Sequence, residues 1–231
     1  MSAWGLTVAE WQAVRLSLQV ALTAVVVSLP FGVALGWLLA RRPFRGQSLV
    51  ETLLNLPLVM PPVVTGYVLL LTFGRRGWIG RYLDEWFGLQ IAFTWKGVAL
   101  ASAVMAFPLM VQAIRVAFSS ADARLAQAAR TLGAGRLDAF FTVTLPLARH
   151  GIVAGCVLAF ARSLGEFGAT LMISGSIPGR TRTIPLEIYN LLESPDGAAG
   201  AQRLVILSIL IAAAALYASR LFERRAGRAA G

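Results

Sequence analysis

The sequence predicts an all-α polytopic membrane protein, and three observations carry that prediction. The chain of 231 residues is 57% apolar, has a mean hydropathy of +0.70 and holds only 14% charged residues. A soluble domain holds about 25% charged residues, because its surface faces water. Five separate stretches are each apolar over a length close to the roughly 20 residues with which a helix crosses a bilayer.

The charged and reactive residues exclude several other classes of protein. The net charge of +10 alone would suggest nucleic-acid binding, but it comes from 20 arginines and Lys96, spread between apolar stretches. A single cysteine, Cys156, allows no internal disulfide. One cysteine and one histidine, His150, leave no basis for a closed zinc site.

The first three apolar stretches contain no charged residue. Residues 16–40 follow no basic region and no small-residue cleavage pattern follows them, which predicts a retained helix and not a signal peptide. Residues 53–73 form the second expected span and residues 97–114 the third. Prolines inside these two spans predict bends that would serve as hinges, because proline removes a backbone donor. They are Pro57, Pro61, Pro62 and Pro108.

The fourth expected span, residues 150–174, differs from the others by containing Arg162 and Glu166. Their four-residue spacing would place both on one helix face, where they can pair. A charge in mid-bilayer costs roughly 2.5 kcal/mol or more, so it is a functional candidate by default. The alternative is that the pair neutralises itself and holds the bundle together. The fifth span, residues 204–219, is uncharged.

The arginines also predict an orientation, since cytoplasmic loops carry an excess of basic residues. With the N-terminus outside, the inner segments hold eleven arginines and the outer loops hold seven basic residues. The eleven are Arg41, Arg42, Arg45, Arg124, Arg130, Arg136, Arg149, Arg220, Arg224, Arg225 and Arg228. We therefore expect a periplasmic N-terminus and a cytoplasmic C-terminus.

The long inner loop, residues 119–149, is neither apolar enough to span nor polar enough to be a linker. Ser119 and Asp122 have the spacing of a capping box, and an alanine-rich stretch up to Leu132 favours a helix. Gly133 then ends that helix, and Pro146 marks the entry to the next span. Such an element either lies on lipid headgroups or fits a groove on a soluble partner, and its chemistry alone leaves both open.

The same loop resembles that of ABC-importer permeases, which reads Glu-Ala-Ala, three residues, Gly, nine residues, Ile, one residue, Leu-Pro. This chain has Gln127-Ala128-Ala129, Gly133, Val143 and Leu145-Pro146 at the same spacing, with Gln for Glu and Val for Ile. The resemblance implies a type I ABC importer transmembrane domain over residues 11–220 with a cytoplasmic tail, 221–231. It also implies that the loop holds a coupling helix for a cytoplasmic ATPase. Its coupling residues would be Ala126, Gln127, Ala128, Ala129, Arg130, Thr131, Leu132 and Gly133.

A second resemblance concerns the substrate. Residues 55–67, NLPLVMPPVVTGY, and residues 161–170, ARSLGEFGAT, are similar to the second and fourth spans of molybdate and tungstate permeases. Sulfate and thiosulfate permeases are similar in the fourth span. The resemblance implies a molybdate permease, with a sulfate permease as the alternative. It makes Arg162, Ser163, Glu166 and Thr170 candidates for the translocation path or its gating.

The energy source has to be another polypeptide. Lys96, the one lysine, lies in WKGVAL, so the chain has no phosphate-binding loop of the form G-x-x-x-x-G-K-S/T. We expect no catalytic, cofactor or metal site in this chain, with ATP and Mg²⁺ held by a partner ATPase. A membrane-embedded enzyme lacks its chemistry here, and a secondary transporter remains the alternative from another class.

The resemblance also implies the partners. Five spans are few to enclose a path, which predicts a homodimer with two ATPase copies, alternating between outward and inward states. Outer loops 74–95 and 175–202 would receive a periplasmic oxyanion-binding protein, with Arg180 and Arg182 as candidate contacts. The spacings Gly32/Gly36 and Gly151/Gly155 permit close helix contact. The remaining partner is the lipid bilayer, and no nucleic acid is expected.

Overall fold

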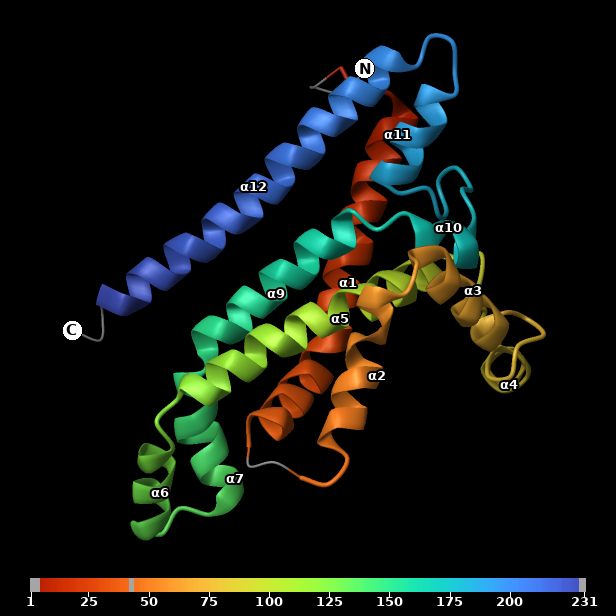
Figure 1. The fold of residues 1–231 in the computed structure, drawn as a ribbon. Helices are drawn as coiled ribbons and strands as arrows, with labels where there is room; N and C mark the ends of the chain where they lie inside the picture. The colour runs from red at the N-terminus through yellow and green to blue at the C-terminus, as the bar shows by residue number, and fades with distance from the viewer. Residues whose placement is uncertain (1–4, 42–43, 229–231) are drawn as a thin grey trace.

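The computed structural model describes residues 5–41 and 44–228, and these residues form helices joined by loops, with no strand among them (Figure 1). The helices are α1 (Val8–Ala40), α2 (Gln47–Val59), α3 (Pro62–Phe73), α4 (Gly80–Phe87), α5 (Trp95–Ser120), α6 (Ala123–Thr131), α7 (Arg136–Ala139), η1 (Phe140–Thr144), α8 (Leu145–Leu147), α9 (Arg149–Leu164), α10 (Gly168–Ser174), α11 (Ile184–Leu192) and α12 (Ala198–Arg228).

Three of these helices are long and apolar enough to cross a membrane unbroken, namely α1, α5 and α12. Two bent pairs bring the number of spans to as many as five, in agreement with the sequence. The first pair is α2 with α3, bent by 111°, and the second is the segment Arg136–Leu147 with α9, bent by 66°. The chain is therefore a multi-pass membrane protein.

Helix α5 is the centre of the bundle, because α1 and α9 both pack along it. Its side chains Met105, Met110 and Ile114 are fully buried. The two glycine pairs with the predicted close-contact spacing, Gly32/Gly36 and Gly151/Gly155, both face α5. A methyl group added at Gly36 would lie 2.7 Å from Ile114 Cγ2, and one at Gly155 would lie 3.0 Å from the Met110 carbonyl oxygen. The small residues thus permit close packing within one chain.

The second span is broken at Pro61 and Pro62, whereas Pro57 lies inside α2, which continues through it. Helix α2 ends at Val59, Pro61 precedes the first residue of α3, and Pro62 is that first residue, where a missing N–H costs nothing. The expected bend in this span is therefore present. Pro108 behaves differently, because α5 continues through it from Trp95 to Ser120 and no break occurs there. The hinge expected at Pro108 therefore stays a prediction.

The fourth expected span is wrong in its outer half. Helix α9 ends at Leu164, and α10 starts only at Gly168. Glu166 lies in the break, so it does not share a helix face with Arg162 as the spacing predicted. The apolar residues that continue beyond the break belong to α10, which packs on α3 and α5 and not in line with α9.

The other boundaries differ in length. Helix α1 begins at Val8 because Thr7 and Glu10 form a capping box, eight residues before the apolar stretch. Helix α12 continues to Arg228, so the expected tail from residue 221 is helical within the described residues. Arg203, near the start of α12, reaches the buried Glu10 carboxylate at 2.7 Å and ties α12 to α1.

The contact between α3 and α10 depends on Gly66, where the two backbones approach closely. A Cβ at this position would lie 2.6 Å from the Ala169 carbonyl oxygen and 2.7 Å from its Cα, so Gly66→Ala requires the backbones to separate. We expect a loss of roughly 1–3 kcal/mol of stability, measured as a lower Tm of the protein in detergent. Gly165→Ala is the control, since its Cβ would meet nothing nearer than 3.9 Å. An equal Tm for both variants would contradict this packing argument.

Candidate coupling helix and transport pathway

The predicted coupling loop folds as a short projecting helix, α6, that ends as expected. Gly133 has φ +99°, a left-handed conformation, and the Ala134 amide closes the turn on the Ala129 carbonyl oxygen at 3.1 Å. The start of the helix differs from the prediction. Asp122 is the cap, its carboxylate accepting from the Arg124 amide at 2.9 Å, whereas Ser119 belongs to the last turn of α5. The capping box assigned to Ser119 is therefore wrong.

The coupling residues divide between two faces of α6. Ala126 and Ala129 are half-buried on the side that packs on η1 and α7, while Gln127, Ala128 and Arg130 are exposed. Leu132 is 89% exposed, which is unusual for a leucine that lies outside the membrane-spanning helices. Three further apolar side chains of this element are exposed although they lie outside the motif. They are Leu125, Leu137 and Phe141.

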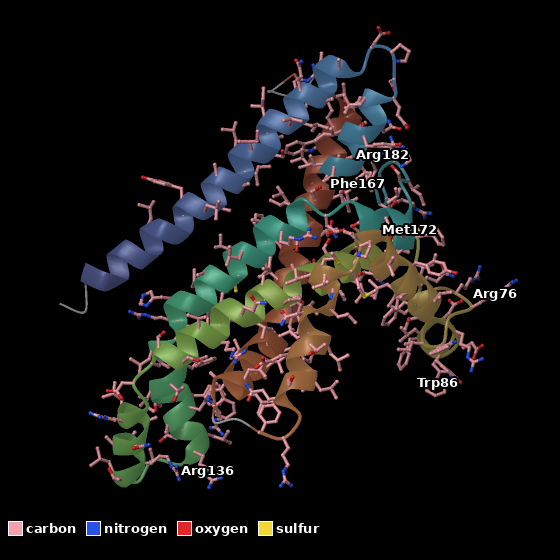
Figure 2. All side chains as sticks on the ribbon, in the orientation of Figure 1. Arg76, Trp86, Arg136, Phe167, Met172 and Arg182 are labelled. Atoms are coloured by element: carbon pink, nitrogen blue, oxygen red, sulfur yellow. The ribbon has the colours of Figure 1, made fainter. Side chains whose placement is uncertain are left out.

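A set of aromatic rings connects this element to the spans. The ring of Phe140 lies 4.9 Å from Trp37 at the end of α1 and 6.2 Å from Phe118 at the end of α5, measured between centroids. The Arg41 guanidinium packs over the Trp37 ring, with its carbon 3.5 Å from the ring centroid. Phe140 therefore ties η1, next to α6, to the ends of both long helices. Figure 2 shows Arg136 at this end, far from Arg76 and Trp86.

The left-handed turn at Gly133 gives a matched pair of variants. Gly133→Ala places a Cβ in a conformation that costs an L-residue roughly 1–2 kcal/mol, which corresponds to a 5- to 30-fold shift in population. We expect a several-fold loss of co-purifying ATPase. Gly135→Ala should have no effect, because Gly135 has φ −64° and open space around it. Equal ATPase recovery from the two variants would show that the turn does not matter for docking.

The intramembrane charges form a closed pair. Arg162 Nη1 lies 2.8 Å from Glu166 Oε2, and the Glu166 side chain is 2% exposed. The second carboxylate oxygen, Oε1, accepts from the Ala169 amide at 3.0 Å. Both oxygens of Glu166 are thus in use, which holds the break between α9 and α10 and positions Arg162. The Arg162 side chain keeps 28% exposure, so it is the accessible partner of the pair.

Buried hydroxyl groups line the same region. Ser163 on α9 and Thr170 on α10 are buried, and their hydroxyls have no hydrogen-bond partner in the described structure. Thr65 on α3 shares this property, although the sequence gave no reason to select it. Buried hydroxyl groups in proteins are usually hydrogen-bonded, so these three side chains are candidates for contact with a polar solute. Thr65 is not among the residues predicted from the sequence.

Helix α2 is attached to the bundle by polar contacts. None of its residues is buried, but Glu51 Oε1 lies 2.9 Å from Arg115 Nη1, and the Gln112 side-chain amide donates to Asn55 Oδ1 at 2.6 Å. The segment is bounded by Gly46, at φ +90°, and by the break after Val59. Helix α2 is therefore held on α5 by polar side-chain contacts, between a left-handed glycine and a sharp bend.

The two outer-loop arginines have different surroundings. Arg182 is held inside its loop by Ser176 Oγ at 3.1 Å and by Glu187 Oε2 at 3.2 Å, so it is a structural residue and not an exposed contact as expected. Arg180 is exposed and lines a cavity between the two outer loops. Tyr189, on α11, packs against Phe167 in the break, with the two rings tilted by 56° and their centroids 5.5 Å apart. A hydrogen bond to Glu193, together with the charge of that carboxylate, raises the pKa of the Tyr189 phenol.

A helical bundle with broken spans and a projecting helical loop is the fold of type I ABC importer transmembrane domains. The inward-facing methionine ABC transporter MetNI is similar with a TM-score of 0.68 at 18% identity, over 97% of this chain and 99% of that chain. The bacterial alginate ABC transporter in complex with its alginate-bound periplasmic protein is similar with a TM-score of 0.71 at 17% identity, over 93% and 78%. These likenesses establish the fold class.

The chain belongs to the family of binding-protein-dependent transport system inner membrane components, whose model matches residues 32–228. The molybdenum transport system permease protein ModB of Escherichia coli K12 is 57% identical over 96% of this chain and 99% of its own length. ModB of Haemophilus influenzae is 49% identical over 94% of each chain. The sulfate transport system permease protein CysW of Synechocystis is 35% identical over 93% of this chain and 77% of its own.

Proposed function

We propose that this chain is the membrane-spanning subunit of an ABC importer that carries molybdate into the cell. The observation that carries the proposal is the 57% identity to a molybdenum permease along nearly the whole of both chains. The 35% identity to CysW makes sulfate the second candidate, with lower support. Tungstate, which is chemically close to molybdate, belongs to the same proposal.

The proposed orientation places α6 in the cytoplasm and the N-terminus outside. In Figure 1, α6 and α7 lie at the opposite end of the molecule from the N-terminus and α11, as this orientation needs. The apolar side chain of Leu132 would then face water unless a partner covers it. We assign that partner as a cytoplasmic ATPase, which would bind ATP and Mg²⁺. Two permease copies and two ATPase copies would complete the transporter, with an oxyanion-binding protein outside.

The proposed mechanism is alternating access driven from α6. Closure of the ATPases on ATP would move α6, and the contacts of Phe140 with Trp37 and Phe118 would pass that movement to α1 and α5. Helix α2 would move as a segment between Gly46 and the bend after Val59, because its contacts with α5 are polar and can be replaced by contacts with water. The break in the fourth span would line the path, with Arg162 favouring an anion and the unpartnered hydroxyls of Ser163 and Thr170 solvating it.

Substrate identity is tested by competition. Cells that depend on this transporter should take up labelled molybdate in the presence of a large excess of sulfate, whereas excess tungstate should compete. The expected discrimination is at least tenfold, since the sulfate ion is smaller and a site built for the larger oxyanion leaves donors unpaired around it. Complete inhibition by equimolar sulfate would instead assign the chain to sulfate transport.

A further inference from the structure

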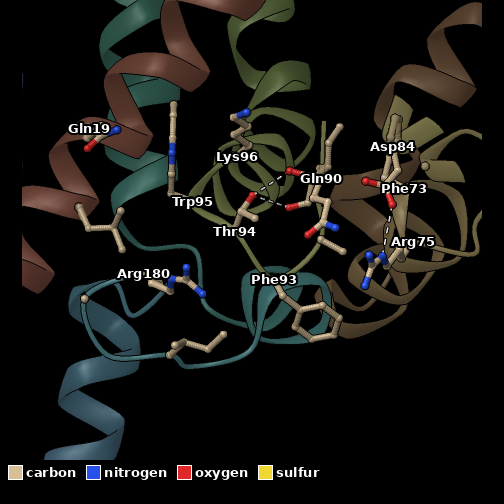
Figure 3. A pocket seen from close by; sticks show the side chains of 16 residues that line it. Gln19, Phe73, Arg75, Asp84, Gln90, Phe93, Thr94, Trp95, Lys96 and Arg180 are labelled. Carbon is tan, nitrogen blue, oxygen red and sulfur yellow. Dashed lines mark hydrogen bonds and ion pairs between the residues drawn. The ribbon is translucent and has the colours of Figure 1, made fainter. Parts of the chain in front are cut away.

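A cavity of about 750 Å³ opens at the outer end of the chain, away from the break that lines the proposed path (Figure 3). Three segments distant in sequence meet there, and each brings a cation: Arg75 after α3, Lys96 at the start of α5, and Arg180 between α10 and α11. Asp84 is the one acidic side chain in the lining, and it forms an ion pair with Arg75, whose Nε lies 3.3 Å from Asp84 Oδ2. Lys96 and Arg180 form no ion pair with any described residue, so the lining carries an excess of positive charge.

The loop that carries Arg180 is built firmly. Thr181 is fully buried, and its hydroxyl accepts from the Ile177 amide at 2.9 Å and donates to the Gly175 carbonyl at 3.3 Å. The neighbouring Arg182 is fixed on Ser176 and Glu187. Internal contacts therefore fix the backbone on one side of Arg180 while its own side chain is left to the cavity, as Figure 3 shows. Arg182 thus stabilises the loop, whereas Arg180 is free to bind a ligand in the cavity.

The remaining lining suits an anion as well. Gln19 and Gln90 supply amide donors, and Thr94 precedes α5 without capping it, because its hydroxyl donates to the Gln90 and Ile91 carbonyl oxygens. The first amides of the 26-residue helix α5 therefore lack a side-chain acceptor, which adds positive potential beside Lys96.

We propose that this cavity receives a tetrahedral divalent oxyanion after its release by the binding protein, with Lys96 and Arg180 as its charged ligands. The proposal rests on the proposed oxyanion import. One water occupies about 30 Å³ of liquid, so the cavity holds the ion with part of its hydration shell. Because the ion keeps part of its hydration shell, it binds weakly. Weak binding is what a transport site requires, since the ion has to leave it again.

The test uses Trp95, which lines the cavity, as a fluorescent reporter. The other five tryptophans are replaced by phenylalanine in a transporter complex that retains uptake, and sodium molybdate is titrated at constant ionic strength. We expect a saturable change in emission, with an apparent affinity weakened about tenfold or more in Lys96→Gln/Arg180→Gln. Arg76→Gln, which removes an outer-loop charge outside the cavity, is the control and should titrate like the parent. No saturable change, or equal weakening in both variants, would overturn the proposal.

Two further measurements separate this site from the function on which it rests. A titration with sodium sulfate should also saturate and weaken in the double variant. A response to sulfate without one to molybdate would refute molybdate as substrate and leave the site standing. Uptake by the double variant should fall at saturating binding protein, with an unchanged KM for that protein. A raised KM with unchanged maximal uptake would show that the two cations dock the binding protein, which contradicts an oxyanion site.

Discussion

Replacing Leu132 with aspartate is expected to abolish both co-purification of the ATPase and transport. Leu132 is 89% exposed at the tip of α6, and full burial of a leucine in a partner's groove contributes roughly 1.5–3 kcal/mol. A carboxylate in that groove loses this contribution and adds an unpaired charge, so the affinity should fall at least about a hundredfold. The measurement is the amount of ATPase recovered with the tagged permease from detergent-solubilised membranes.

The matched control applies the same change at the opposite end of the molecule. Leu192, the last residue of α11, is 66% exposed. Leu192→Asp should leave ATPase recovery unchanged, whatever it does to docking outside. Normal recovery with Leu132→Asp would contradict the coupling surface, as would equal losses from both variants.

The second large effect concerns the pair in the fourth span. Arg162→Ala leaves the buried Glu166 carboxylate with a single backbone donor, so the protein should lose both stability and transport. Breaking a buried ion pair costs about 3–5 kcal/mol, and the partial exposure of Arg162 places this case at the lower end. A lower Tm in detergent and a low yield of folded protein are the expected results.

The double variant Arg162→Gln/Glu166→Gln separates structure from transport. It removes both charges together, retains hydrogen-bonding groups at the break, and should recover most of the lost Tm. Uptake should stay at least about tenfold below that of the parent, because the accessible guanidinium that favours an anion is gone. If uptake recovers along with stability, the pair is purely structural and Arg162 has no role in the path.

Hydropathy was sufficient to find the spans, and the prolines indicated the break in the second, but the break in the fourth was missed. Residues 165–167 separate α9 from α10, but the residues on both sides of this break are apolar. The mean hydropathy of the stretch is therefore high throughout and does not reveal the break. The structural signal is local: Gly165 ends one helix, and the Glu166 carboxylate turns back to Arg162 and forward to Ala169. The four-residue spacing correctly predicted that Arg162 pairs with Glu166. The bond from the Ala169 amide to Glu166 could not be predicted from a continuous helix, because it forms across the break.

The coupling loop was predictable because its signals are local. An alanine-rich stretch followed by Gly133 specifies a helix and its end, and both are present. The partner-facing residues were less predictable, since exposure of Leu132 and burial of Ala129 depend on how α6 sits on η1. The role of Arg182 was missed for the same reason, because its partners Ser176 and Glu187 meet it only after the loop folds.

The central claim is import powered by a separate ATPase, and reconstitution tests it most directly. The permease with its ATPase is placed in liposomes with ATP and Mg²⁺ inside and the oxyanion-binding protein with labelled molybdate outside. We predict accumulation that requires all three of ATP, ATPase and binding protein, and that Leu132→Asp abolishes. Accumulation by the permease alone, driven by an ion gradient without ATP, would contradict the account and assign the chain to secondary transport.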